Sequence, residues 1–143
     1  MPWTAPEEIG LHLIATSHAV RDGLDRLLAE PLLADLSEDG RGTLWTVLAE
    51  VLNNIVEHAY AGTEGDIRLR LWRRDGALSF EVLDCGAPMP GLRLPDGKLA
   101  ELGDFDDLPE GGFGWFLIRS MTNGLVYDRI GGENRLRFCM ECH

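Results

Sequence analysis

Residues 50–60 read EVLNNIVEHAY, and this stretch decides how the rest of the chain is interpreted. Its apolar residues recur at the three- and four-residue spacing of one helix face. The polar side chains of Glu50, Asn54 and His58 recur at the same spacing beside them. At about 3.6 residues per turn they form a narrow stripe next to the apolar face. We therefore predict one helix from about residue 43 to residue 60.

The polar stripe has the residue types of a small phosphate-handling site. An Asn amide oxygen such as that of Asn54 is a hard ligand suited to Mg²⁺, which also takes phosphate oxygens as ligands. A carboxylate one turn away, Glu50, can orient or deprotonate an attacking hydroxyl. His58 has two open interpretations, contact with phosphate through its ring or ordinary capping and packing. For the stripe as a whole, the simpler alternative is a solvated helix face.

Two glycine motifs later in the chain favour the same kind of ligand. Asp84 ends a predicted strand, where its carboxylate can accept a hydrogen bond from the amino group of adenine. Two residues later, Gly86 would let the backbone approach the base, although this pattern also marks ordinary turns. Gly112, Phe113 and Gly114 precede a predicted helix, whose free N–H groups and dipole favour phosphate. Each motif is weak when taken alone, because glycine-rich turns are common.

The remaining segments predict a mixed order of strands and helices. Alternation predicts strands over about 9–15, 66–74, 77–84, 125–130 and 134–141. Further helices are predicted after an N-cap at Ser17 and over about 114–121, while the polar segment 36–42 is interpreted as a turn. Because most neighbouring strands are hairpin-linked, we expect a largely antiparallel sheet with helices on one face. The predicted fold is a two-layer α/β sandwich that forms a single domain over residues 1–143.

Composition and charge restrict the classes of function. The chain has 143 residues, 45% of them hydrophobic and 26% charged, as in an ordinary globular domain. A formal charge of -11 argues against nucleic acid as a direct partner and is compatible with a partner that has a basic surface. No apolar stretch is long enough to span a bilayer, and the first residues do not resemble a leader. We expect a cytoplasmic protein without membrane contact.

Other conspicuous side chains have structural interpretations. Cys139, Cys142 and His143 match the C-x-x-C-H haem-attachment pattern. Haem, a zinc or redox pair, and coincidence are the alternatives, and coincidence is favoured because such haem attachment normally needs export. Trp72 and Trp115 are expected to pack or to form an interface rather than to contact a cofactor.

Taken together and in order, these motifs resemble the GHKL ATPase superfamily, and most closely the bacterial anti-sigma-factor serine/threonine kinases. The most specific part is E-x-x-x-N-x-x-x-H-A-Y at residues 50–60. The resemblance implies the Bergerat ATP-binding fold, with ATP and Mg²⁺ as cofactors. It implies that Glu50 is the general base and Asn54 the Mg²⁺ ligand. Asp84 and Gly86 are similar to the adenine-binding box.

The same resemblance covers the phosphate end of the site and the loop before it. Gly112, Phe113 and Gly114 are similar to the second glycine box at the phosphates. The irregular segment from about 87 to 110 resembles the family's mobile ATP lid. The lid is strongly acidic, and besides Arg119 few basic residues lie near the glycine box.

The function implied is that of a partner switch. Members of this kinase family phosphorylate a serine or threonine on an anti-anti-sigma antagonist, sequester a sigma factor, and are commonly homodimers. One alternative is a nucleotide-binding module that acts by sequestration alone, which the acidic lid and sparse cations favour. Another is a histidine-kinase catalytic domain, which is disfavoured because no helical hairpin with a phosphoaccepting His precedes the first predicted strand.

Overall fold

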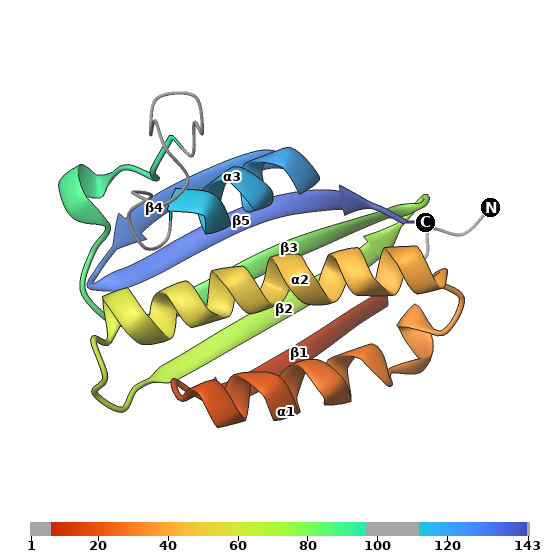
Figure 1. Ribbon diagram of the computed structural model, residues 1–143, viewed down its shortest axis with the longest axis horizontal. Coiled ribbons are helices and arrows are strands. Elements are labelled where there is room, and N and C mark those ends of the chain that lie inside the picture. Colours follow the sequence, from red (N-terminus) through yellow and green to blue (C-terminus); the bar gives the residue numbers. More distant parts are fainter. Residues whose placement is uncertain (1–6, 97–111, 143) are drawn as a thin grey trace.

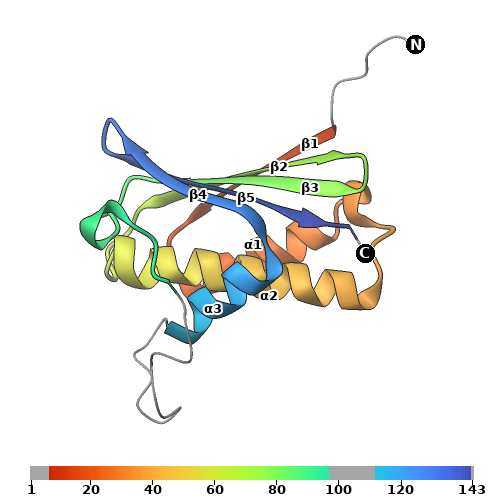
Figure 2. The same ribbon diagram turned by 90° about the horizontal axis from the view of Figure 1, so that it is seen from above.

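The computed structural model describes residues 7–96 and 112–142. Within these ranges the chain forms a five-stranded antiparallel sheet whose one face is covered by three α-helices (Figures 1 and 2). Seen from above in Figure 2, the strands form one layer and the helices lie together below it. The two-layer α/β sandwich with an antiparallel sheet is therefore confirmed, and it is consistent with a Bergerat-type ATPase fold.

The sheet has the strand order β1-β2-β3-β5-β4, and each neighbouring pair is antiparallel. The strands are β1 (Glu7–Ile14), β2 (Asp66–Arg74), β3 (Ala77–Asp84), β4 (Asn123–Ile130) and β5 (Glu133–Glu141). Asp75 and Gly76 both have positive φ, as a two-residue hairpin turn requires, and they join β2 to β3 as predicted. Strand β5 begins at Glu133, one residue before the predicted start, so only Gly131 and Gly132 separate it from β4.

Alternation along the strands sends one set of side chains into the core. Leu69, Leu71, Phe80 and Phe138 are almost completely buried beneath the helices. The rings of Phe80 and Phe138 stack across β3 and β5 with centroids 4.9 Å apart. Burial of these apolar surfaces is what holds the helices on this face of the sheet.

Both N-terminal helices begin differently from the prediction. Helix α1 (Ser17–Leu28) is capped by Thr16, whose hydroxyl accepts from Ala19 N, so the N-cap predicted at Ser17 is wrong by one residue. After a short 3₁₀ turn (Pro31–Leu33), helix α2 (Glu38–Asn54) starts inside the segment predicted as a turn. Ser37 caps α2 by accepting from Gly40 N at 3.0 Å. The polar residues of segment 36–42 are capping and first-turn residues, which have the same composition as a loop.

Helix α2 does not continue as an α-helix to residue 60. Residues Ile55–Ala59 form a π-turn (η2), in which Tyr60 N donates to Ile55 O at 3.0 Å. The wider π ring inserts an additional residue into the last turn, and such turns occur frequently at functional sites. The prediction of one regular α-helix through residue 60 is therefore wrong beyond Asn54. The side chains of Asn54 and His58 nevertheless both line the same cavity.

The segment after β3 is described only in part. A short 3₁₀ turn, η3 (Pro90–Leu92), lies between the end of β3 and residue 96. Residues 97–110 of the predicted lid lie outside the described residues. Helix α3 (Gly112–Met121) then packs against α2 and leads into β4. No helix within the described residues has the length and apolar character needed to cross a bilayer.

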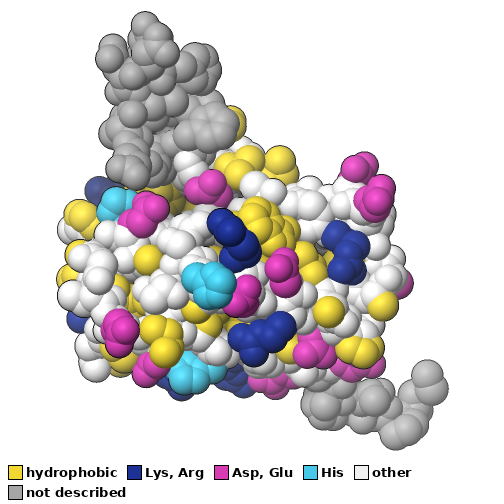
Figure 3. Space-filling view, turned by 60° about the horizontal axis from the view of Figure 1, so that its bottom comes forward, with side chains coloured by type: hydrophobic (Ala, Val, Ile, Leu, Met, Phe, Trp, Pro, Cys, Tyr) yellow, Lys and Arg dark blue, Asp and Glu magenta, His cyan; other side chains and the backbone are white. Residues whose placement is uncertain are grey.

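The outer face of the sheet carries ion pairs instead of a second helical layer. Arg70 pairs with Glu8 and Glu81, and Arg137 pairs with Asp128 at 3.0 Å. On the α1 side of the molecule, basic and acidic side chains are interspersed (Figure 3).

Cys139 lies within β5, where its sulfur is 3.5 Å from Ser79 Oγ, and Cys142 is partly buried against the core. His143 lies outside the described residues, so the C-x-x-C-H alternatives stay open.

Candidate functional site

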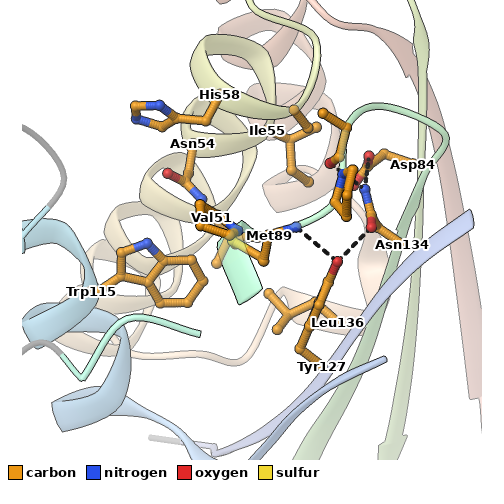
Figure 4. Close-up of a pocket in the computed structure, with 14 residues that line it drawn as sticks. Val51, Asn54, Ile55, His58, Asp84, Met89, Trp115, Tyr127, Asn134 and Leu136 are labelled. Atoms are coloured by element: carbon orange, nitrogen blue, oxygen red, sulfur yellow. Dashed lines mark hydrogen bonds between the residues drawn. The ribbon is translucent and has the colours of Figure 1, made fainter. Parts of the chain in front are cut away.

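A cavity of about 230 Å³ lies between the end of α2, the first turns of α3 and the ends of β3 and β5 (Figure 4). Most of its wall is apolar. The large apolar side chains in this wall are Val51, Ile55, Met89, Trp115 and Leu136. The polar side chains that reach it are Asn54, His58, Asp84, Tyr127 and Asn134. An apolar cavity with a few convergent polar groups is the usual form of a small-ligand site.

Asp84 is the acidic group of the cavity wall. Its residue surface is only 6% exposed, and its Oδ1 accepts from Gly86 N at 2.9 Å and from Asn134 Nδ2 at 2.8 Å. Within the described residues no hydrogen bond is formed to Oδ2, which remains available to a ligand donor. Burial raises the pKa of Asp84, while the hydrogen bonds from Asn134 and Gly86 oppose that shift.

Asn134 was not anticipated as a site residue. Its amide oxygen accepts from Tyr127 Oη at 2.6 Å and from Arg129 Nη1 at 2.8 Å. Tyr127 Oη in turn accepts from Met89 N at 3.0 Å, so the network reaches the segment that follows β3. The sequence contained a signal for this position. Asn134 alternates in step with Leu136, Phe138 and Met140 along β5, so its side chain points to the same inward face of the sheet. An amide at a core position of a strand needs partners.

Gly86 lies where two backbones approach each other closely. A Cβ at this position would come within 2.5 Å of Ala59 O. The next residue, Ala87, donates its N–H to the same oxygen at 2.7 Å. Glycine is therefore required for steric reasons between the π-turn and the loop after β3.

Tyr60 fixes the end of η2 to the backbone that follows β3. Its hydroxyl donates to Asp66 O at 2.6 Å and accepts from Cys85 N at 2.9 Å. The ring lies against Gly65, where a Cβ would come within 2.1 Å of the ring. Burial raises the pKa of Tyr60, so the phenol stays protonated and can donate. Tyr60 thus fixes the end of the helix to the residue between Asp84 and Gly86.

The predicted phosphate end of the site is only partly joined to the cavity. Asn54 and His58 line it from one side, opposite Asp84 and Asn134 (Figure 4). Glu50 does not line the cavity, but its Oε2 lies 2.5 Å from the place where a Cβ on Gly114 would be. Glu50 therefore faces the first turn of α3, one helical turn beyond Asn54.

Trp115 packs as expected and also contributes to the site. It is 3% exposed, and its ring forms part of the cavity wall beside Asn54 and Val51 (Figure 4). Gly112 and Phe113 are the first residues of α3, and the roles predicted for them remain predictions.

The residues present fit a purine nucleotide better than an apolar ligand. A buried carboxylate at the inner end matches a ring that carries an amino donor, and the apolar wall matches the faces of that ring. An amide and a carboxylate at the outer end, beside a helix that begins with glycine, match phosphates and a hard cation.

Comparison with known proteins agrees with this geometry. A model of the family described as "Histidine kinase-like ATPase domain" matches residues 12–140, a range that runs from the end of β1 into β5 and includes every residue that lines the cavity. A comparison with curated proteins finds no match. The family implies ATP binding, typically with Mg²⁺, and a kinase-like activity. The chain belongs to the family of histidine kinase-like ATPase domains.

Proposed function

We propose that this protein is an ATP-dependent serine/threonine kinase of the anti-sigma type, which works by partner switching. The observation that carries the ATP-binding part is the convergence of Asp84 and Asn54 on one cavity, with Glu50 beside the adjoining helix. Family membership supports ATP binding and kinase-like activity. The serine/threonine specificity and the partners rest on the resemblance of EVLNNIVEHAY to anti-sigma kinases.

Asp84 is the proposed adenine-recognising group. Its Oδ2 would accept a hydrogen bond from the exocyclic amino group, since Oδ1 already has two partners. Gly86 contributes by close backbone approach, since any side chain there would collide with Ala59. Ile55, Met89 and Trp115 supply the apolar surface against which the ring would lie.

Asn54 and the start of α3 form the proposed phosphate end. The Asn54 amide oxygen would hold Mg²⁺, which when bound neutralises charge on the phosphates. The N–H groups at Gly112 and Gly114 lie at the positive end of the α3 dipole and would bind phosphate oxygens. His58, on the same side of the cavity as Asn54, would bind a phosphate oxygen through its ring.

Glu50 is the proposed general base. Its carboxylate points toward Gly114, one turn from the Mg²⁺ ligand, where it can accept the proton of a serine or threonine hydroxyl. We expect Glu50→Ala to bind ATP normally and to lose phosphoryl transfer by about 100-fold or more. Calorimetry would measure the first quantity and a radiolabel transfer assay the second. Transfer equal to that of the wild type would exclude Glu50 as the base.

The proposed partners follow from this assignment. A serine or threonine on an anti-anti-sigma antagonist would be the phosphoryl acceptor, and a sigma factor would be the sequestered protein. The net charge of -11 is compatible with partners that have basic surfaces and opposes direct binding of nucleic acid. A homodimer and a cytoplasmic location are part of the same proposal.

A second candidate function is sequestration without phosphoryl transfer. Arg119, a cation near the glycine motif, donates its Nε to Pro95 O at 2.8 Å and is partly committed to the backbone. Five acidic residues occur between residues 101 and 110, namely Glu101, Asp104, Asp106, Asp107 and Glu110. Both features reduce the positive charge available to a triphosphate.

One assay separates the two functions. The protein is incubated with γ-labelled ATP, Mg²⁺ and a panel of recombinant anti-anti-sigma antagonists, with Glu50→Ala as the matched control. Label on a serine or threonine of an antagonist supports the kinase. ATP binding with stable sigma-factor capture, but with no label transferred to any antagonist, supports sequestration alone.

A further inference from the structure

Asn134 has a saturated set of hydrogen bonds at the inner end of the cavity. Its amide nitrogen donates to Asp84 Oδ1 at 2.8 Å and to Ala87 O at 2.9 Å, with a longer bond of 3.3 Å to Gly86 O. Its amide oxygen accepts from Tyr127 and Arg129. An amide offers two N–H donors and one oxygen with two lone pairs, so the side chain has one allowed orientation.

Strand register brings these groups together. Asp84 and Asn134 are direct partners in the antiparallel β3–β5 ladder, so their side chains lie side by side at the end of both strands. Tyr127 and Arg129, on the neighbouring strand β4, lie on the same inward face. Arg129 also donates to Gly86 O at 2.8 Å, and Tyr127 binds Met89 N. The amide therefore links the carboxylate to the backbone that forms the cavity wall.

We propose that Asn134 is a positioning residue for recognition of the purine amino group. Its nitrogen holds Asp84 in the one rotamer that leaves Oδ2 directed to the ligand. Its oxygen, through Tyr127 and Arg129, holds the wall from Gly86 to Met89 at the distance that the ring needs. This inference rests on the proposed function, because it requires the cavity to bind ATP.

The same contact controls the charge of Asp84. Burial raises the pKa of this carboxyl, and the bond from Asn134 lowers it. The other charged and titratable groups that act on it are Arg129 on β4, Glu133 on β5 and Tyr60 at the end of η2. Loss of the Asn134 donor should therefore raise the pKa further. A protonated Asp84 would offer a hydroxyl where the purine amino group needs an acceptor.

The test compares ATP with purine riboside 5′-triphosphate, which lacks only the amino group. Wild-type protein should prefer ATP by about tenfold at pH 7.5, the value of one charge-assisted hydrogen bond. Asn134→Ala should reduce this preference to about twofold or less, and it should also weaken binding of both nucleotides, because Tyr127 and Arg129 lose their shared acceptor. Asn134→Asp keeps an acceptor for Tyr127 and Arg129 but removes the donor, and should also lose the preference. Calorimetry with Mg²⁺ present measures each affinity.

The pH dependence of ATP affinity distinguishes a positioning role of Asn134 from a purely structural one, which would not change it. The pH below which ATP affinity declines should be higher in Asn134→Ala than in the wild type. Asn134→Thr, which retains a hydroxyl donor, should partly restore both the preference and the pH profile. Asn123→Ala, an exposed amide at the start of β4, is the matched control and should behave as the wild type.

The outcomes separate this inference from the proposed function. Failure of the wild-type protein to bind ATP would refute the proposed function. Wild-type preference for ATP that persists in Asn134→Ala, with an unchanged pH profile, would overturn the inference and leave the function standing. Thermal unfolding checks that each variant folds. If the Asn134 variants do not fold, Tyr127→Phe replaces them, and it should reduce the preference about threefold; an unchanged preference in that variant would overturn the inference.

Discussion

At the scale of single residues, burial of the Asp84 carboxylate has an energetic cost that its proposed role in adenine recognition would explain. A carboxylate that is 6% exposed and hydrogen-bonded through one oxygen is costly to bury, and its second oxygen would present an acceptor to the proposed ligand. Because burial raises the pKa of Asp84 above the ordinary value of 3.8, the folded protein holds this proton more tightly than the unfolded chain does. Its contribution to stability therefore decreases as pH rises from 3.8 through the raised folded value.

The first prediction follows from that sign. Asp84→Asn keeps an oxygen for Gly86 and Asn134 but carries no charge, so the ligand-free variant should unfold at a higher temperature than the wild type at neutral pH. The difference in melting temperature between variant and wild type should become smaller as the pH falls from the raised pKa of Asp84 toward 3.8. ATP affinity should fall by about 10- to 100-fold, because an amide cannot provide the charged acceptor. Thermal scans across pH and calorimetry test both parts, and a lower melting temperature at pH 7 would contradict the assignment.

The two site glycines should respond differently to alanine. In Gly86→Ala the new Cβ meets backbone, Ala59 O at 2.5 Å, so the variant should lose about 2 kcal/mol of unfolding free energy. In Gly114→Ala the nearest atom is Glu50 Oε2, which can rotate away, and the helix gains a better helix former. Gly114→Ala should therefore remain folded while phosphoryl transfer falls by about tenfold, through displacement of the base. Urea unfolding and the transfer assay distinguish the two variants, and full transfer in Gly114→Ala would mean that the position of Glu50 is unimportant.

At the scale of elements, the long helix joins two ends with different tasks. Its N-terminus is a conventional cap, Ser37 bonded to Gly40 N, far along the helix from the cavity. Its C-terminal end is the π-turn that carries His58 and presents Ala59 and Tyr60 to the loop after β3. The additional residue of the π-turn lets Ala59 O reach Ala87 N and lets Tyr60 reach Cys85.

Matched variants at the two ends test this division. Ser37→Ala should cost about 1 kcal/mol of stability and leave ATP affinity unchanged. Tyr60→Phe should cost about 2 kcal/mol, because it leaves Cys85 N and Asp66 O without their partner. It should also weaken ATP binding, since Cys85 lies between Asp84 and Gly86. Urea unfolding and calorimetry measure the two quantities, and equal ATP affinities in both variants would contradict a role for Tyr60 in the site.

At the scale of the whole molecule, the proposed nucleotide site would couple ligand binding to the fold. The cavity is bordered by α2, α3, β3, β4 and β5, so a ligand bound there would stabilise contacts between the two layers. At a concentration of 100 times its Kd, ATP should stabilise the protein by about 2.7 kcal/mol, which corresponds to about 5–10 °C in melting temperature. Differential scanning fluorimetry measures this shift. Glu50→Ala should retain the shift and Asp84→Asn should lose most of it, and a shift of equal size in both would place the ligand elsewhere.

The sequence by itself was sufficient for the order of elements and the two-layer antiparallel sandwich, and it singled out Asn54 and Asp84, which the structure brings to one cavity. These predictions depend on local signals, namely helical and strand periodicity and glycines beside polar residues, which lie within a few residues of each other. Capping residues and loop residues have the same composition, so the start of α2 was misplaced, and a single α-helical period could not indicate the π-turn.

Only the tertiary structure decided which distant groups meet. Asn134 joins Asp84 because antiparallel register pairs them across β3 and β5, although 50 residues separate them in the chain. Tyr127, Arg129 and Met89 enter the same network through β4 and the loop after β3. Strand pairing between remote segments leaves no periodic trace in either segment, and a one-residue shift would direct each side chain to the opposite face of the sheet. Register is set by the energy of the whole core, which is why the hydrogen-bond network of this site could be recognised only in the folded molecule.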